Sequence, residues 1–126
     1  MGYGEQLGGK LVGSTTTKQL FKSSLGPNDI VACVIAGNIA ATYPMGAAMV
    51  IDTSNPGRRV RYVNGNSSTA TGACVLMQDV TTTVGGGNVT ADAARDGNVD
   101  STMVVDANGA LVDAGFRALL PKMMFD

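Results

Sequence analysis

The side chains that could perform chemistry in this chain are few, and their spacing does not fit the common catalytic arrangements. The sequence has no histidine, which removes Ser-His-Asp triads, Cys-His dyads and histidine-bearing metal sites. Cys33 and Cys74 lie in separate apolar runs, as is typical of buried thiols that pack as small hydrophobic groups. Glu5 is the only glutamate, so paired catalytic carboxylates would have to be aspartates. We therefore predict that the protein is not an enzyme and holds no cofactor.

Two motifs imitate ligand-binding loops. Residues 96–100 spell DGNVD, the opening of a calcium loop, but the positions that should be Gly and Glu are Ser101 and Ala107. An ordinary turn rich in Asp and Asn fits this segment better. The glycines at 85–87 precede Asn-Val-Thr instead of the Lys and Ser or Thr of a phosphate loop. These motifs predict turns, with no bound metal and no small-molecule substrate.

The charged residues are scarce and unevenly distributed. The net charge is −1, and charged residues make up 15% of the chain, against about 25% for a typical soluble domain. Three basic groups cluster at Arg58, Arg59 and Arg61, whereas the second half of the chain is acidic. Such a cluster is either a contact with carboxylates of a neighbouring subunit or partner, or a solvated turn. The overall charge does not favour nucleic acid as a partner.

One uncharged stretch is long enough to require a membrane test. Residues 30–51 contain no charged side chain, a length that could cross a bilayer. However, Gly37-Asn38 and Tyr43-Pro44 interrupt the stretch, and small residues dilute its hydropathy. Two strands joined by a loop explain it better than a membrane helix. Residues 1–10 also lack the charged and apolar regions of a secretory signal, so no membrane partner is predicted.

The first 26 residues have the composition of an extended arm. They are rich in Gly, Ser and Thr, with few apolar residues and no helical period. The run Thr15, Thr16 and Thr17 suits an extended conformation, and Leu20 and Phe21 are the expected apolar anchors to a partner. A turn cluster, Gly-Pro-Asn-Asp, then closes the segment. We predict an N-terminal arm over residues 1–26 and a β-rich domain over residues 27–126.

The domain has the short strands and frequent turns of a small β-sandwich or barrel-like body. The run 30–36 is apolar throughout, as expected for a strand buried on both faces. At 59–63 charged and apolar residues alternate, which predicts Val60 and Tyr62 inward and the arginines outward. Further strands are expected at 46–52, 73–80, 102–105 and 110–112, the last two as a hairpin around Asn-Gly. A short helix over 114–120, stopped by Pro121, and a final strand or apolar tail at 122–125 complete the prediction.

The order of these segments resembles the small head-decoration, or cement, proteins of tailed bacteriophages, including the lambda type and its prophage relatives. The resemblance covers residues 18–126 and lies in four segments: KQLFKSSLGPNDIVACVIAG, YPMGAAMVIDTSNPGRRVRYV, TGACVLMQDVTT and the ending ALLPKMMF. The order and spacing of the segments carry it. The chain departs from the family pattern at Pro121, which interrupts the closing helix, and at the Asn/Asp-rich hairpin of 96–109.

The resemblance implies a structural virion protein made in the host cytoplasm. Such proteins form homotrimers on the capsid exterior, contact the major capsid protein and stabilise the head against internal DNA pressure. By this resemblance the arm, through Thr15, Thr16, Thr17, Leu20 and Phe21, would bind the capsid, and Arg58, Arg59 and Arg61 would lie at a subunit or capsid interface.

Two alternatives remain on the sequence alone. Another virion part, such as a tail-tube or fibre-associated domain, would share the same composition. A small trimeric β enzyme would need a phosphate-cradling loop and ordered carboxylates, and the sequence offers neither.

Overall fold

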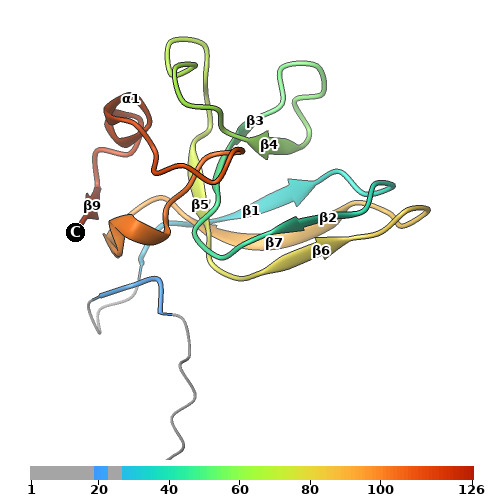
Figure 1. The fold of residues 1–126 in the computed structure, drawn as a ribbon, viewed down its shortest axis with the longest axis horizontal. Helices are drawn as coiled ribbons and strands as arrows, with labels where there is room; N and C mark the ends of the chain where they lie inside the picture. Colours follow the sequence, from blue (N-terminus) through green and yellow to red (C-terminus); the bar gives the residue numbers. More distant parts are fainter. Residues whose placement is uncertain (1–18, 23–26) are drawn as a thin grey trace, which may run out of the picture.

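The chain folds as a small β-barrel extended by two short ribbons, so the prediction of a mainly β, barrel-like body with a short C-terminal helix is confirmed (Figure 1). The structure is a computed structural model and describes residues 19–22 and 27–126. The strands are β1 (Ile30–Ile35), β2 (Ala41–Tyr43), β3 (Ala48–Ile51), β4 (Arg59–Arg61), β5 (Cys74–Leu76), β6 (Val80–Thr82), β7 (Val89–Ala94), β8 (Gly97–Val99) and β9 (Met123–Phe125).

The barrel has the strand order β1-β4-β3-β5-β7 and closes unevenly. On one side β1 pairs antiparallel with β7 along its whole length, from Ile30↔Ala94 to Ile35↔Val89. On the other side it meets β4 at a single parallel pair, Ile35↔Arg59. The seam between β1 and β4 is therefore the least paired part of the barrel.

Strand β1 differs from its prediction. Its β-branched composition favours a strand, but only one face is well buried: Cys33 and Ile35 are fully buried, whereas Ile30 is 48% exposed. The uninterrupted apolar run therefore does not mean burial on both faces.

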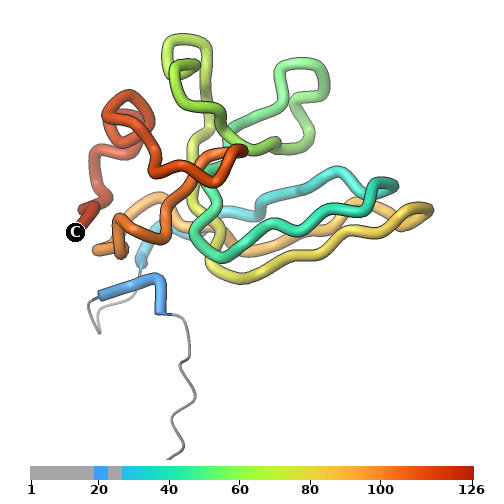
Figure 2. Tube along the Cα trace, viewed as in Figure 1, coloured from blue at the N-terminus to red at the C-terminus, as the bar shows by residue number. Residues whose placement is uncertain are grey.

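Two loops project together from the barrel and form a feature that we call the finger, residues 36–40 between β1 and β2 and residues 83–88 between β6 and β7. Figure 2 shows both loops extending to the same side, away from the helix. Asn38 accepts a hydrogen bond from the Gly85 amide (2.9 Å), and Asn88 accepts one from Gly37 (3.1 Å). At Gly37 an added Cβ would lie 2.0 Å from the Gly87 carbonyl oxygen, so only glycine allows this close approach.

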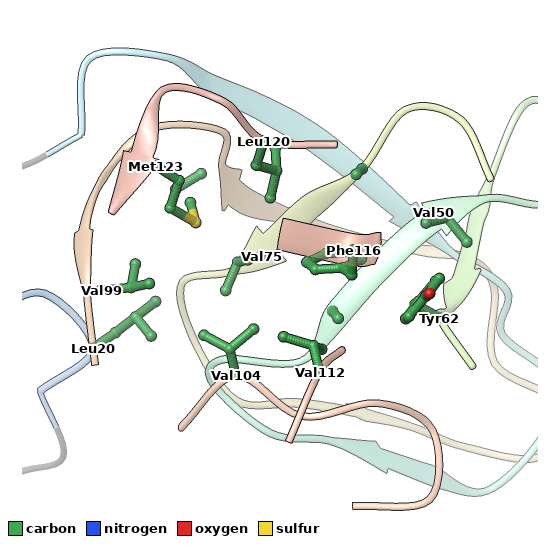
Figure 3. Close-up of a cluster of buried hydrophobic side chains, with 13 residues drawn as sticks. Leu20, Val50, Tyr62, Val75, Val99, Val104, Val112, Phe116, Leu120 and Met123 are labelled. Atoms are coloured by element: carbon green, nitrogen blue, oxygen red, sulfur yellow. The ribbon is translucent and has the colours of Figure 1, made fainter. Parts of the chain in front are cut away.

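The apolar residues form two cores on opposite faces of the barrel strands. One fills the barrel and includes Cys33, Ile35 and Met49. The other lies between the barrel and the C-terminal segment, where the Tyr62 and Phe116 rings pack with centroids 4.9 Å apart (Figure 3). The second core attaches the last third of the chain to the barrel.

Helix α1 (Ala114–Ala118) confirms the predicted helical turn before Pro121. The Asp113 side chain caps it by accepting a hydrogen bond from the Phe116 amide (2.9 Å). Beyond the helix, β9 pairs in parallel with β8, a short strand that the sequence prediction assigned to a turn.

Three other sequence predictions need correction. The predicted strand at 102–105 begins instead with a 3-10 turn, η1 (Ser101–Met103), because the Asp100 side chain caps it. The hairpin around Asn108-Gly109 forms but is shorter than predicted: one antiparallel bridge, Val105↔Leu111, is flanked by backbone hydrogen bonds from Asp106 to Ala110 (2.8 Å) and from Val112 to Val104 (3.2 Å). The predicted strand at 73–80 is split into β5 and β6, which join different sheets.

The uncharged stretch at 30–51 forms three strands, β1, β2 and β3, one more than the two-strand interpretation expected. Among the described residues no helix has the length and hydropathy needed to cross a membrane.

The second core makes a direct stability prediction. Phe116 is fully buried, so Phe116→Ala removes an aromatic side chain and leaves a cavity. We expect the free energy of unfolding, measured by urea denaturation, to fall by about 3–5 kcal/mol. Leu111, which is 52% exposed, is the control, and Leu111→Ala should change stability by less than about 0.5 kcal/mol. Equal effects of the two changes would contradict the assigned core.

Candidate binding groove

The three arginines of the sequence prediction lie on one short segment, but their orientation differs from the expected one. Tyr62 is buried, as predicted, whereas Val60 on the same face is 39% exposed. Arg59 and Arg61 are half-buried and lie on the opposite face of the strand. This face adjoins the barrel core, because Arg61 pairs with the core residue Met49 on β3. The expectation of outward arginines is therefore wrong, because their face of β4 packs toward the barrel core and half-buries both side chains.

Each arginine has its own set of contacts. Arg58 forms an ion pair with Asp52, with 3.1 Å between its Nε and the carboxylate oxygen Oδ2. Arg59 donates hydrogen bonds to the carbonyl oxygens of Gly72 (2.9 Å) and Ala32 (3.2 Å), so it connects β4 with β1 and with the segment before β5. These contacts hold the three guanidinium groups in different surroundings.

Of the three arginines, Arg61 has the poorest hydrogen bonding. One of its terminal nitrogens donates to the Asp106 carbonyl oxygen (2.6 Å), while its Nε is buried and has no hydrogen-bond partner among the described residues. Burial lowers the pKa of the Arg61 guanidinium, and the Asp106 carboxylate partly offsets this effect. An arginine remains protonated at neutral pH even so, and a buried N–H without an acceptor is costly.

These arginines line a groove of about 390 Å³ between β4 and the β1–β2 segment. The opposite wall comprises Ile39 at the finger and Thr42 and Tyr43 on β2. Ile39 is 54% exposed, so an aliphatic surface borders the cationic one. The groove thus combines guanidinium groups with an apolar rim, a combination suited to binding and without an evident nucleophile or base.

The predicted anchors of the arm lie partly within the body. Leu20 is 3% exposed and belongs to the second core, and Phe21 packs against that core and forms a bridge with Val99. The backbone of Leu20 also accepts a hydrogen bond from the Asp100 amide (2.8 Å). Leu20 is therefore not free to anchor a partner, and the body includes residues 20–22. Thr15, Thr16 and Thr17 lie outside the described residues.

The calcium-like motif is used for backbone hydrogen bonds. Asp96 accepts hydrogen bonds from the amides of Asn28 (2.9 Å) and Asp29 (3.0 Å), and Asp100 accepts from the amide and hydroxyl of Thr102. In the described part of the chain no group of three or more acidic or cysteine side chains could hold a metal ion.

Two aspartates have structural roles that sequence reasoning missed. Asp113 accepts hydrogen bonds from the Tyr62 hydroxyl (2.9 Å) and the Gly65 amide (2.7 Å) in addition to capping the helix. Asp106 is 2% exposed and accepts from three backbone amides, those of Asn64, Asn108 and Ala110. The sequence shows that Asp113 precedes a predicted helix and that Asp106 precedes an Asn-Gly turn. These positions suggest local capping, but they do not identify the hydrogen-bond donors that lie far away in the chain.

These hydrogen bonds shift the acidity of both carboxyl groups. The amides of Phe116 and Gly65 hold the pKa of Asp113 below its usual range. Burial acts to raise the pKa of Asp106, but its backbone donors and Arg61 lower it overall. Both carboxyl groups are therefore charged at neutral pH and stabilise the loops around them.

The two cysteines are buried and free, in agreement with the interpretation from sequence. The neighbouring Cys33 thiol and burial together raise the pKa of Cys74, which disfavours its reactive thiolate form.

Comparisons with known proteins found no matching family model, curated protein or solved structure.

The lowered pKa values of Asp106 and Asp113 predict an acid-sensitive fold. Their contribution to stability is complete above the ordinary aspartate pKa of 3.8 and is lost as pH falls through their lower folded pKa values. Asp113→Asn should reduce the free energy of unfolding at pH 7 by about 1–3 kcal/mol, because it removes a charged acceptor from buried donors. In denaturation series below pH 4 the difference from the parent chain should shrink.

The control for this series is Asp92→Asn, because Asp92 is exposed on β7. It should leave stability within about 0.5 kcal/mol of the parent at pH 7. An Asp113→Asn variant that kept the full pH dependence of the parent below pH 4 would contradict the structural role of this carboxylate.

Proposed function

We propose that this chain is a non-catalytic structural protein that docks as a homotrimer on the exterior of a phage capsid. There it contacts the major capsid protein and stabilises the head against the pressure of packaged DNA. The order of its strand and turn segments, which resembles the head-decoration proteins, supports the proposal. The protein is made in the host cytoplasm and carried on the virion.

The observation that carries a docking function is the exposure of large aliphatic side chains on the finger and beside the arginines. Ile39 and Val84 of the finger are 54% and 77% exposed, and Val60 is 39% exposed. Aliphatic groups exposed beside a cationic groove are typical of surfaces that a partner protein covers. The low charge content of the chain agrees with a surface that is partly hidden in an assembly.

The arm supplies the second part of the proposed attachment. Leu20 belongs to the core, so the capsid-binding portion is confined to the residues before it, with the Thr15–Thr17 run as the segment suited to strand pairing. Phe21 packs against the same core and bridges Val99, so it belongs to the body together with Leu20.

The arm proposal is tested by truncation at two points. Removing residues 1–18 leaves Leu20 in place, so the thermal unfolding temperature should stay within a few degrees of the parent value while occupancy on undecorated capsids falls sharply. Removing residues 1–25 also deletes buried Leu20 and should lower stability by about 2–5 kcal/mol. Occupancy is measured by sedimentation with capsids and quantitative gel analysis. Full occupancy by the chain lacking residues 1–18 would refute the role of the arm.

The oligomeric state is tested on the particle. Electron microscopy of decorated capsids should place three copies around threefold and quasi-threefold positions of the outer surface. The isolated chain can be monomeric without contradicting the proposal, because the capsid can assemble the trimer. Copies arranged as dimers, or found on the tail, would overturn it in favour of another assembly or another virion part.

A further inference from the structure

The edge of β4 that faces the groove is largely unpaired. In the β4 segment, the backbone groups of Arg58 and Tyr62 make the hydrogen bonds to the β3 side, at 3.0 and 2.8 Å. Backbone groups alternate in direction along a strand, so those of Arg59 and Arg61 point to the other edge. There β1 pairs only at Ile35↔Arg59, and the described residues supply no strand partner at Arg61.

The opposite wall of the groove also has an open strand edge. Strand β2 pairs with β6 on one side, through Ala41↔Thr82, Thr42↔Thr81 and Tyr43↔Val80, and has no second strand partner among the described residues. The groove lies between β2 and β4, each three residues long. An extended segment of three residues spans about 10 Å and matches that length.

The charges in the groove select for an acidic occupant. The two ion pairs among the described residues join Arg58 to Asp52 and Arg95 to Asp29. Arg59 and Arg61 therefore form no ion pair among the described residues, although the Asp106 carboxylate lies near enough to stabilise the charge of Arg61. The Nε of Arg61 has no acceptor there. Carboxylates are the preferred protein partners of guanidinium groups in such partly buried positions.

We propose that this groove binds an extended, acidic segment of a partner protein by strand addition. The segment pairs with the open backbone edge at Arg61 and places a carboxylate between Arg59 and Arg61. Its flanking aliphatic side chains contact Ile39 and Val60. This inference rests on the proposed docking function and adds the chemistry of the partner segment.

Other occupants fit the groove less well. The chain's own residues 10–18, with Lys10 and Lys18, have the same charge sign as the arginines and no acidic residue. A nucleic-acid backbone matches the arginines but not the aliphatic rim formed by Ile39 and Val60. An acidic segment with aliphatic neighbours complements both surfaces.

The test titrates the isotope-labelled full chain with the peptide acetyl-Gly-Val-Asp-Val-Gly-amide and follows amide shifts by NMR. Saturable shifts are expected at Thr42, Tyr43 and Arg61. The matched peptide with Asn in place of Asp should bind about tenfold more weakly, because it lacks the charge. Equal binding of the two peptides, or shifts elsewhere on the protein, would overturn the proposal.

Two pairs of variants locate the site. Arg61→Gln should weaken binding of the Asp peptide about tenfold, whereas Arg95→Gln, which removes an exposed arginine elsewhere, should not. Because Arg61 also supports the Asp106 turn, Ile39→Glu provides a second variant on an exposed residue. It adds a competing carboxylate at the rim and should abolish binding of the Asp peptide, whereas Met124→Glu, at an exposed position on β9 outside the groove, should leave binding unchanged.

The remaining outcomes are also decisive. Self-association in analytical ultracentrifugation that Ile39→Glu abolishes, without peptide binding, would assign the groove to a second copy and overturn the proposal. Tighter binding of inorganic phosphate or DNA than of the Asp peptide would do the same in favour of an anion site. If the Ile39→Glu variant still attaches to capsids, the groove is not the attachment site, but the proposed function stands. If neither the parent chain nor any variant attaches to capsids, the proposed function is refuted.

Discussion

The burial of Tyr62 is the constraint on which the rest of the structure depends. Its ring packs on Phe116 at 4.9 Å, and its hydroxyl donates to Asp113 at 2.9 Å, so one side chain fixes both the second core and the cap of α1. Because side chains alternate along a strand, an inward Tyr62 directs Arg59 and Arg61 to the opposite face. The position of the cationic groove is thus a consequence of how the C-terminal segment packs.

The incomplete closure of the barrel has the same origin. One edge of β4 pairs with β3, and Tyr62, directly after β4, packs against the C-terminal segment. Strand β1 pairs along its whole length with β7. Only the pair Ile35↔Arg59 closes the seam, and the side chain of Arg59 adds hydrogen bonds to backbone carbonyls on both sides of it. Side-chain bonds here replace a backbone ladder, which leaves an open edge at Arg61.

Aspartates account for much of the order in the segments without regular structure. Asp106 and Asp113 together accept hydrogen bonds from backbone amides in two loops and from the Tyr62 hydroxyl. An ionised carboxylate accepts several such bonds at once, and this lowers its pKa. Some of the acidic residues in the second half of the chain are thus used inside the fold.

The sequence by itself determined the local features: the β class, the turn at Asn108-Gly109, the helix before Pro121 and the burial of Cys33 and Cys74. These follow from residue type and short-range spacing. It did not reveal β7, because a strand such as VTADAA with small buried alanines has a weak apolar signal. The sequence also did not predict that Leu20 is buried in the core or that Arg61 lines the groove. Those outcomes depend on contacts between residues far apart in the chain, Leu20 with Asp100 and Arg61 with Asp106, and only tertiary packing selects such partners.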